Sequence, residues 1–194
     1  MEQLRKTPSQ TVGPFFAYGL TAEQYGYDYN SIMNGSLVDG DTPGERIYIT
    51  GSIFDGNGNS IPDALIELCH ADSLGQYRAL PINCKNDGFT GIGRLGTGTN
   101  TKHTFTFTTI KPGSTANGHA PYINIILFMR GSLLHLYTRM YFWDEPNDND
   151  VLLNSIEASR RQTLIAQRKE VNGIAGYHFD IYMQGEKETV FFDF

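Results

Sequence analysis

The residues of this sequence best suited to chemistry are its five histidines, because imidazole is the commonest metal ligand and titrates near neutral pH. They are His70, His103, His119, His135 and His178. None lies two, three or four residues from another, so the sequence has no tight pair of the His-x-His or His-Glu-x-x-His kind. A metal site would have to be assembled from distant segments. Taken singly, each histidine is better explained by a surface position or a satisfied core position.

Two arginines next to apolar strands are more informative. Arg130 ends the apolar run 123–129, and Arg139 lies inside the run 136–143. A buried guanidinium without an anion is costly, so each arginine is expected to find one. An internal or intersubunit salt bridge is one interpretation. The other is recognition of a ligand carboxylate, which suits the planar fork of arginine, and the residues alone leave both open.

Composition narrows the partners and the location. The net charge of −6 and the pI near 5.3 argue against nucleic acid or an anionic membrane as partner. No apolar run approaches the roughly 20 residues of a membrane helix. The first residues lack the apolar stretch of a signal peptide, so we expect a cytoplasmic protein. In that compartment Cys69 and Cys84 are expected to be free thiols rather than a disulfide.

A strand-rich domain must position these residues. The 12% of aromatic residues and 21 glycines favour strands joined by tight turns. One helix is expected, capped at 148–150 and with an apolar stripe reaching Ile165. Many short strands and one helix indicate a mainly β fold, an antiparallel β-sandwich. The expected strands lie at 46–54, 64–69, 104–108, 123–129, 136–143, 177–183 and 188–194.

The first 45 residues are expected to form an extended N-terminal arm, and residues 46–194 the sandwich. Pro8, Gly13 and Pro14 discourage both helix and regular strand pairing. Rings on a flexible segment are costly to leave in water, so this segment should dock on a partner or on the domain's own surface. The rings in question are Phe15, Phe16, Tyr18, Tyr25, Tyr27 and Tyr29.

Several stretches match a known family in order along the chain. They are Thr7-Pro8-Ser9-Gln10-Thr11-Val12-Gly13-Pro14, Asp55-Gly56-Asn57-Gly58, Ile66-Glu67-Leu68, Ala71-Asp72, Gly75-Gln76-Tyr77, Thr109-Ile110-Lys111-Pro112-Gly113 and much of the closing run 179–194. With them the chain resembles the intradiol ring-cleaving dioxygenases over nearly its whole length. Within that family it is similar to the α type of subunit. The resemblance implies a β-sandwich, non-haem Fe(III) and cleavage of 3,4-dihydroxybenzoate by O2 to 3-carboxy-cis,cis-muconate, a reaction of aromatic catabolism.

The resemblance also implies that the iron site of this chain is vestigial. In the family, two tyrosinates and two histidines hold the ferric ion, which anionic phenolates stabilise. Tyr122 and Asn124 stand at the two histidine positions, and Tyr77 at the first tyrosine position. The second tyrosine should lie in 113–120, which contains none. We therefore expect no metal and no catalytic residue in this chain alone, with Fe(III) held by a homologous β subunit.

The family further implies a substrate pocket at the interface of the two subunits. Thr11, Gly13 and Pro14 would wall this pocket after the arm docks on the partner subunit, and Arg130 would act on the substrate carboxylate. Two alternatives remain. A non-enzymatic β-sandwich ligand-binding module would need neither 11–14 nor Arg130. A self-sufficient catechol dioxygenase is disfavoured by the missing histidine pair.

Overall fold

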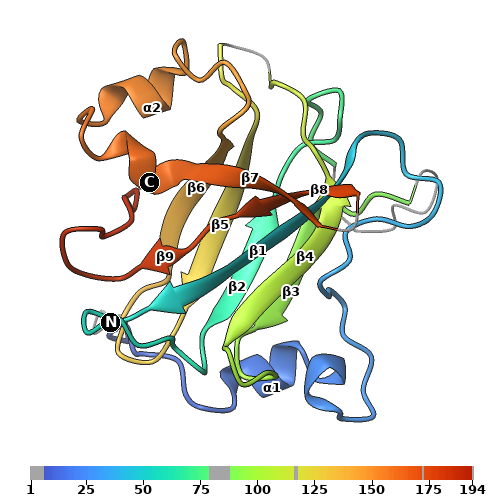
Figure 1. Ribbon diagram of the computed structural model, residues 1–194. Helices are drawn as coiled ribbons and strands as arrows, with labels where there is room; N and C mark the ends of the chain where they lie inside the picture. Colours follow the sequence, from blue (N-terminus) through green and yellow to red (C-terminus); the bar gives the residue numbers. More distant parts are fainter. Residues whose placement is uncertain (1–6, 79–87, 116–117, 172, 194) are drawn as a thin grey trace, which may run out of the picture.

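The computed structural model describes residues 7–78, 88–115, 118–171 and 173–193 (Figure 1). Cys84 lies outside this range. Among the described residues no helix is long and apolar enough to cross a membrane. The strands are β1 (Arg46–Phe54), β2 (Leu65–Cys69), β3 (Ile92–Gly96), β4 (Thr104–Ile110), β5 (Tyr122–Phe128), β6 (Leu136–Phe142), β7 (Ile165–Val171), β8 (Ile174–His178) and β9 (Ile181–Tyr182). The α-helices are α1 (Phe16–Leu20) and α2 (Val151–Ser155), with 3-10 turns at Glu23–Tyr25 and Arg161–Leu164.

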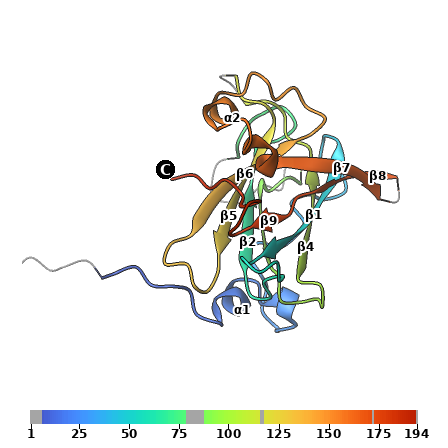
Figure 2. The same cartoon turned by 60° about the vertical axis from the view of Figure 1, so that its left-hand side comes forward.

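The strands form two facing halves that share β7. The strand order is β3-β2-β5-β6-β7-β8-β1-β4, with β9 attached to β1. Ile165 and Ala166 pair in parallel with β6, whereas residues 167–171 of the same strand pair antiparallel with β8. Figures 1 and 2 show β2, β5 and β6 on one side and β1 and β4 on the other. The sheet therefore folds over at β7.

The core lies between the two halves. Ile49 and Phe107 reach it from one half, Leu68 and Ile125 from the other, and all four are fully buried. Burying one such side chain stabilises a fold by about 1.5–3 kcal/mol. This apolar layer fixes the register of β5 and β6, the strands that carry the site described below.

The expectation of a mainly β fold of the antiparallel type is confirmed, with parallel pairing at three places that the sequence did not predict. β1 pairs in parallel with β8 and β9, and β6 in parallel with β7. Parallel pairing needs a long crossover between consecutive strands, and the segment containing α2 provides one between β6 and β7. The expected strand at 188–194 makes only an isolated bridge from Phe192 to Tyr137 among its described residues.

The expectation of one helix reaching Ile165 is wrong. Asp150 does cap α2, accepting a hydrogen bond of 2.8 Å from the backbone N–H of Leu153. The helix ends at Ser155, however, and Ile165 already begins β7. Leu164 is buried against β6 rather than aligned on a continuous helical stripe. Tertiary packing has overridden a helical pattern that was compatible with the sequence.

The expected arm is attached to the domain over much of its length. Leu37 is fully buried, and its N–H donates a hydrogen bond of 2.9 Å to the carbonyl of Thr108 in β4. Further upstream, Phe16 of α1 packs on Phe128 with ring centroids 5.4 Å apart. Residues 7–11 are exposed and lead away from the body in Figure 2. The arm therefore has an attached part and a projecting part.

Candidate functional site

Three residues expected at a vestigial iron site do lie together. Tyr122 and Asn124 are two residues apart on β5, so their side chains point to the same face. The Nδ2 group of Asn124 donates a hydrogen bond of 3.0 Å to the hydroxyl of Tyr77. In the register of β5 with β6, Tyr122 stands opposite Tyr141 and Asn124 opposite Arg139. These five residues form one cluster, which we call the closed cluster.

Arg139 fills the centre of the closed cluster. Its Cζ lies 3.9 Å from the centroid of the Tyr122 ring, a close cation–π contact. Its Nε donates a hydrogen bond of 3.0 Å to Oδ1 of Asn124. Its Nη1 is buried without a hydrogen-bond partner, and within the described part of the chain no carboxylate forms an ion pair with it. The expected anion is therefore replaced by a ring and an amide.

The loop that carries Tyr77 is held by backbone contacts. Asp72 accepts hydrogen bonds at Oδ1 from the N–H groups of Leu74 and Gln76, at 2.9 and 3.0 Å. Gly75 has φ +79°, and a Cβ there would lie 2.0 Å from the carbonyl oxygen of Ser114. Only glycine fits this approach. The close packing of Ser114 on Gly75 thus helps to position the loop so that Tyr77 can accept the hydrogen bond from Asn124.

Asp150 supports the closed cluster from behind. Besides capping α2, it accepts hydrogen bonds from the N–H of Ala120 at 2.9 Å and the hydroxyl of Tyr141 at 3.0 Å, and His119 Nδ1 lies 3.2 Å away. Burial alone would raise the pKa of this carboxyl, but the hydrogen bonds, led by that from Leu153, lower it. Sequence reasoning found Asp150 only as one of three possible helix caps.

The closed cluster does not fit a ferric ion. Burial, followed by the neighbouring Tyr122 hydroxyl, raises the pKa of Tyr77, and burial raises that of Tyr141 against the opposing effect of Arg139. The cluster holds the positive charge of Arg139 and no carboxylate, thiolate or imidazole side chain, whereas Fe(III) favours anionic donors. Asn124 adds only a neutral amide. Residues 7–193, as far as the structure describes them, contain no group of three or more His, Cys, Asp or Glu side chains able to hold a metal.

The predicted pocket residues lie at the other end of β5. The hydroxyl of Thr11 accepts a hydrogen bond of 2.9 Å from the N–H of Gly131, and Gly13 and Pro14 follow on the surface. The side chain of Arg130 is 55% exposed and forms an ion pair with Asp63. The expectation of a buried guanidinium is thus wrong for Arg130, although it does have an anion.

A hollow of about 420 Å³ opens beside Arg130. Its walls combine Arg130 with apolar side chains and with the polar side chains of Asp55 and Gln184; the apolar ones include Met129, Leu136, Met183 and Phe191. A cation at the edge of an apolar hollow suits an aromatic carboxylate. We call Thr11, Gly13, Pro14, Arg130 and this hollow the open end.

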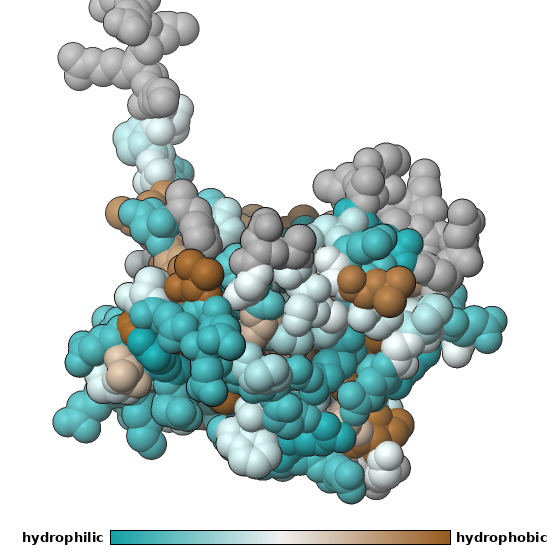
Figure 3. All heavy atoms as spheres, turned by 90° about the horizontal axis from the view of Figure 1, so that it is seen from above, coloured by the Kyte–Doolittle hydropathy of each residue, from teal (hydrophilic) through white to brown (hydrophobic). Residues whose placement is uncertain are grey.

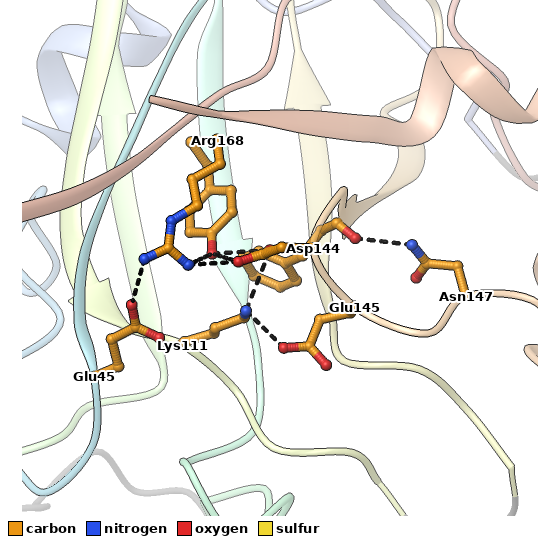
Figure 4. Close-up of polar contacts among 8 residues, drawn as sticks. Glu45, Lys111, Asp144, Glu145, Asn147 and Arg168 are labelled. Carbon is orange, nitrogen blue, oxygen red and sulfur yellow. Dashed lines mark hydrogen bonds and ion pairs between the residues drawn. The ribbon is translucent and has the colours of Figure 1, made fainter. Parts of the chain in front are cut away.

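A third polar region joins the ends of several strands (Figure 4). The carboxylate of Asp144 forms ion pairs with Lys111, at 3.2 Å, and with Arg168, at 2.5 Å. It also accepts a hydrogen bond of 2.9 Å from the hydroxyl of Tyr177. Burial would raise the pKa of Asp144, but these partners, Arg168 first, lower it. Glu145 also pairs with Lys111, at 2.6 Å. All charges in this network have partners, so we assign it to stability.

The histidines remain separate in the described structure. His70 is fully buried between the carbonyl of Ala71, at 2.7 Å, and the hydroxyl of Thr109, at 2.8 Å. Burial lowers its pKa to about 4, so it is neutral near pH 7. His103 lies near Ser60, His135 near Tyr137 and His178 near Asp180. Each therefore has a local role.

Known proteins share much of this sequence. A family model described as dioxygenase matches residues 26–185. Over the full length of both chains, the sequence is 46% identical to the protocatechuate 3,4-dioxygenase alpha chain of Burkholderia cepacia. It is 28% identical to the beta chain from the same organism, over 87% of this chain and 77% of that one.

A solved structure shows the same fold. The dioxygenase domain of a carbohydrate-binding fusion protein from Streptomyces sp. SirexAA-E superposes with a TM-score of 0.64 at 24% identity. The match covers 96% of this chain and 100% of that chain.

Proposed function

This chain belongs to the intradiol ring-cleaving dioxygenases, and from that membership we propose that it is the alpha-type subunit of an enzyme cleaving 3,4-dihydroxybenzoate with O2. In this role it shapes the substrate pocket, and a homologous beta-type subunit holds the Fe(III). The product would be 3-carboxy-cis,cis-muconate. The cytoplasmic location expected from the sequence stays a prediction.

The observation that carries the assignment of iron to the partner is the closed cluster. A guanidinium lies 3.9 Å from the Tyr122 ring centroid, and Asn124 hydrogen-bonds both Arg139 and Tyr77. A positive charge and neutral donors oppose a ferric ion. The ion held by the partner would supply the activation of the aromatic diol toward O2.

The open end supports a role of this chain in substrate binding. Arg130 keeps an exposed guanidinium beside the 420 Å³ hollow. The substrate carries a carboxylate, and a guanidinium attracts and orients such a group. Thr11 accepts a hydrogen bond from the backbone N–H of Gly131, a residue that lines the hollow, and Gly13 and Pro14 follow Thr11 closely along the chain. We propose that these residues form this chain's wall of the shared pocket.

Exposed apolar side chains support docking of a partner subunit on the arm and the neighbouring hairpin. Phe15 is 77% exposed, Ile32 86%, and Leu133 in the β5–β6 connection 65%. By contrast, the face in Figure 3 shows small hydrophobic groups among mostly hydrophilic side chains. Large apolar side chains left in water on adjoining segments are typical of interaction surfaces. The beta-type subunit is the partner that we propose for this surface.

Co-expression with a beta-type subunit tests the assignment. We expect the chain purified alone to be colourless and iron-free, and the complex to show the visible tyrosinate-to-iron absorption and to cleave 3,4-dihydroxybenzoate. Stoichiometric iron in this chain alone, measured by elemental analysis, would contradict the assignment. A non-enzymatic binding module would form no active complex with any beta-type subunit.

A further inference from the structure

The position of Arg139 suggests a role beyond packing. Its guanidinium lies among the three side chains that stand at former ligand positions, Tyr77, Tyr122 and Asn124. Arginine stays protonated under all physiological conditions. The cluster therefore contains a permanent positive charge at its centre.

The Arg139 side chain also contacts the donor groups that a metal ion would need. Its Nε donates a hydrogen bond to the amide oxygen of Asn124, and its guanidinium stacks over the ring of Tyr122. The amide Nδ2 group of Asn124 donates a hydrogen bond to the hydroxyl oxygen of Tyr77. No carboxylate of the described chain forms an ion pair with Arg139, and the buried carboxylate of Asp150 reaches the cluster only through the Tyr141 hydroxyl. A cation entering the cluster would meet both repulsion and occupied donors.

We propose that Arg139 is a metal-excluding residue, an internal cation that keeps this chain unloaded and so directs the iron of the enzyme to one subunit type. The inference rests on the proposed function for its biological meaning. Its physical content is narrower, namely that the charge at position 139 suppresses metal binding between β5 and β6.

The charge has to be separated from the loss of ligands, because Tyr122 and Asn124 are themselves poor donors. The test therefore starts from the full-length variant Tyr122→His/Asn124→His, which puts two imidazoles on one face of β5 beside Tyr77. Zn²⁺ is the probe, because three protein ligands of N and O type make a usual open zinc site. Arg139→Gln and Arg139→Met are then added separately, and Arg139→Lys serves as the charge-preserving control.

We expect the starting variant and its Arg139→Lys form to bind Zn²⁺ weakly in competition with a chromophoric chelator. Removal of the charge by Gln or Met should raise the Zn²⁺ affinity by on the order of a hundredfold, given two like charges a few ångströms apart. Lys102→Gln, which removes an exposed charge elsewhere, should change nothing. Circular dichroism confirms folding, and the Met form substitutes if the Gln form does not fold.

Equal Zn²⁺ affinity whether residue 139 is charged or neutral would overturn the proposal, and so would tight binding in the presence of Arg139. A purely structural arginine predicts this equality, because its loss would move stability but not the ratio of affinities. The measurement involves neither iron nor turnover. Its failure would therefore leave the proposed function standing, whereas failure of the co-expression experiment would remove the function and leave the Zn²⁺ result intact.

Discussion

An arginine lies near each end of β5, in opposite environments: Arg139 on the neighbouring strand β6, opposite Asn124, and Arg130 just after β5 ends. At the closed cluster, Arg139 stacks on a ring and bonds an amide, with one nitrogen buried and unpartnered. At the open end, Arg130 is more than half exposed and already paired with Asp63. From Asn124 to Phe128, where β5 ends, the strand rises by about 13 Å, and Arg130 follows two residues later. One end of the strand is sealed by its own side chains, while the other remains accessible to a ligand.

The difference shows that residue type alone does not define a site. Both arginines end or interrupt apolar runs, and both were open to the same two interpretations. Their cross-strand neighbours decide between them, because Asn124 and Tyr122 close over Arg139 while no aromatic ring stacks on Arg130 in the described structure. Four predictions test how far this contrast holds.

The largest expected effect concerns the support of the closed cluster. Asp150→Ala removes a buried carboxylate that accepts hydrogen bonds from Leu153, Ala120 and Tyr141. Leaving these donors buried and unpaired should lower the free energy of unfolding by about 3–5 kcal/mol, measured by urea denaturation. The matched change at the open end, Asp63→Ala, should cost about 1 kcal/mol or less. Similar losses in both variants would contradict the contrast.

The second prediction is a pH dependence beside the closed cluster, where Cys69 pairs with Asn124 and His70 follows it. The pKa of His70 is lowered to about 4 by burial, from about 6.5 in an unfolded chain. The unfolded state therefore binds the extra proton first as the pH falls. The stabilising contribution is complete above pH 6.5 and is lost between about pH 6.5 and 4, up to about 3 kcal/mol.

Denaturation curves across this pH window check the prediction. His70→Gln should flatten the fall in stability between about pH 6.5 and 4. An unaltered slope in the His70 variant would show that another group titrates there.

The third prediction weakens the closed cluster itself. Arg139→Met keeps an apolar stem but removes the cation–π contact and the hydrogen bond to Asn124, so the unfolding free energy should fall by about 2 kcal/mol. Arg139→Lys should lose less, because the charge over Tyr122 is kept. Added salt should change the loss little, since the contact is partly buried. If Arg139→Met and Arg139→Lys lost equal unfolding free energy, the charge of Arg139 would not be what stabilises the closed cluster.

The smallest effect on stability, and a selective effect on function, is expected at the open end. In the complex with a beta-type subunit, Arg130→Ala should raise KM for 3,4-dihydroxybenzoate about tenfold, because the carboxylate loses a cationic partner. Its unfolding free energy should change by less than about 1 kcal/mol, as for other exposed ion pairs. Arg130→Lys should restore part of the KM. Unchanged kcat and KM would remove Arg130 from the pocket.

Local patterns in the sequence were enough to find the strands with clear alternation. The segment 104–108 predicted β4, and the apolar run 123–129 predicted β5. The strand β7 was missed because residues 167–170 are polar and exposed, which leaves neither alternation nor an apolar run. Its place between β6 and β8 is set by long-range pairing, which local patterns do not encode.

The same limit applied to the closed cluster. The resemblance identified Tyr77, Tyr122 and Asn124, yet it gave Arg139 no part in their site. Only the register that places Arg139 opposite Asn124 reveals the contact. Likewise Asp150 carried a helix-cap signal, whereas its bonds to Ala120 and Tyr141 depend on the fold.

The position of β7 has a mechanical consequence. Because it pairs with β6 at its start and with β8 further on, the two halves are one folded ribbon with β7 as the crease. Two separate sheets can slide over each other, whereas two halves that share β7 are hydrogen-bonded to the same strand. Movement that would part β6 from its neighbours must therefore also pull on β8 and β1. The spacing between Tyr122 and Arg139 is set by the direct pairing of β5 with β6, and β7 links this pair of strands to β8 and β1.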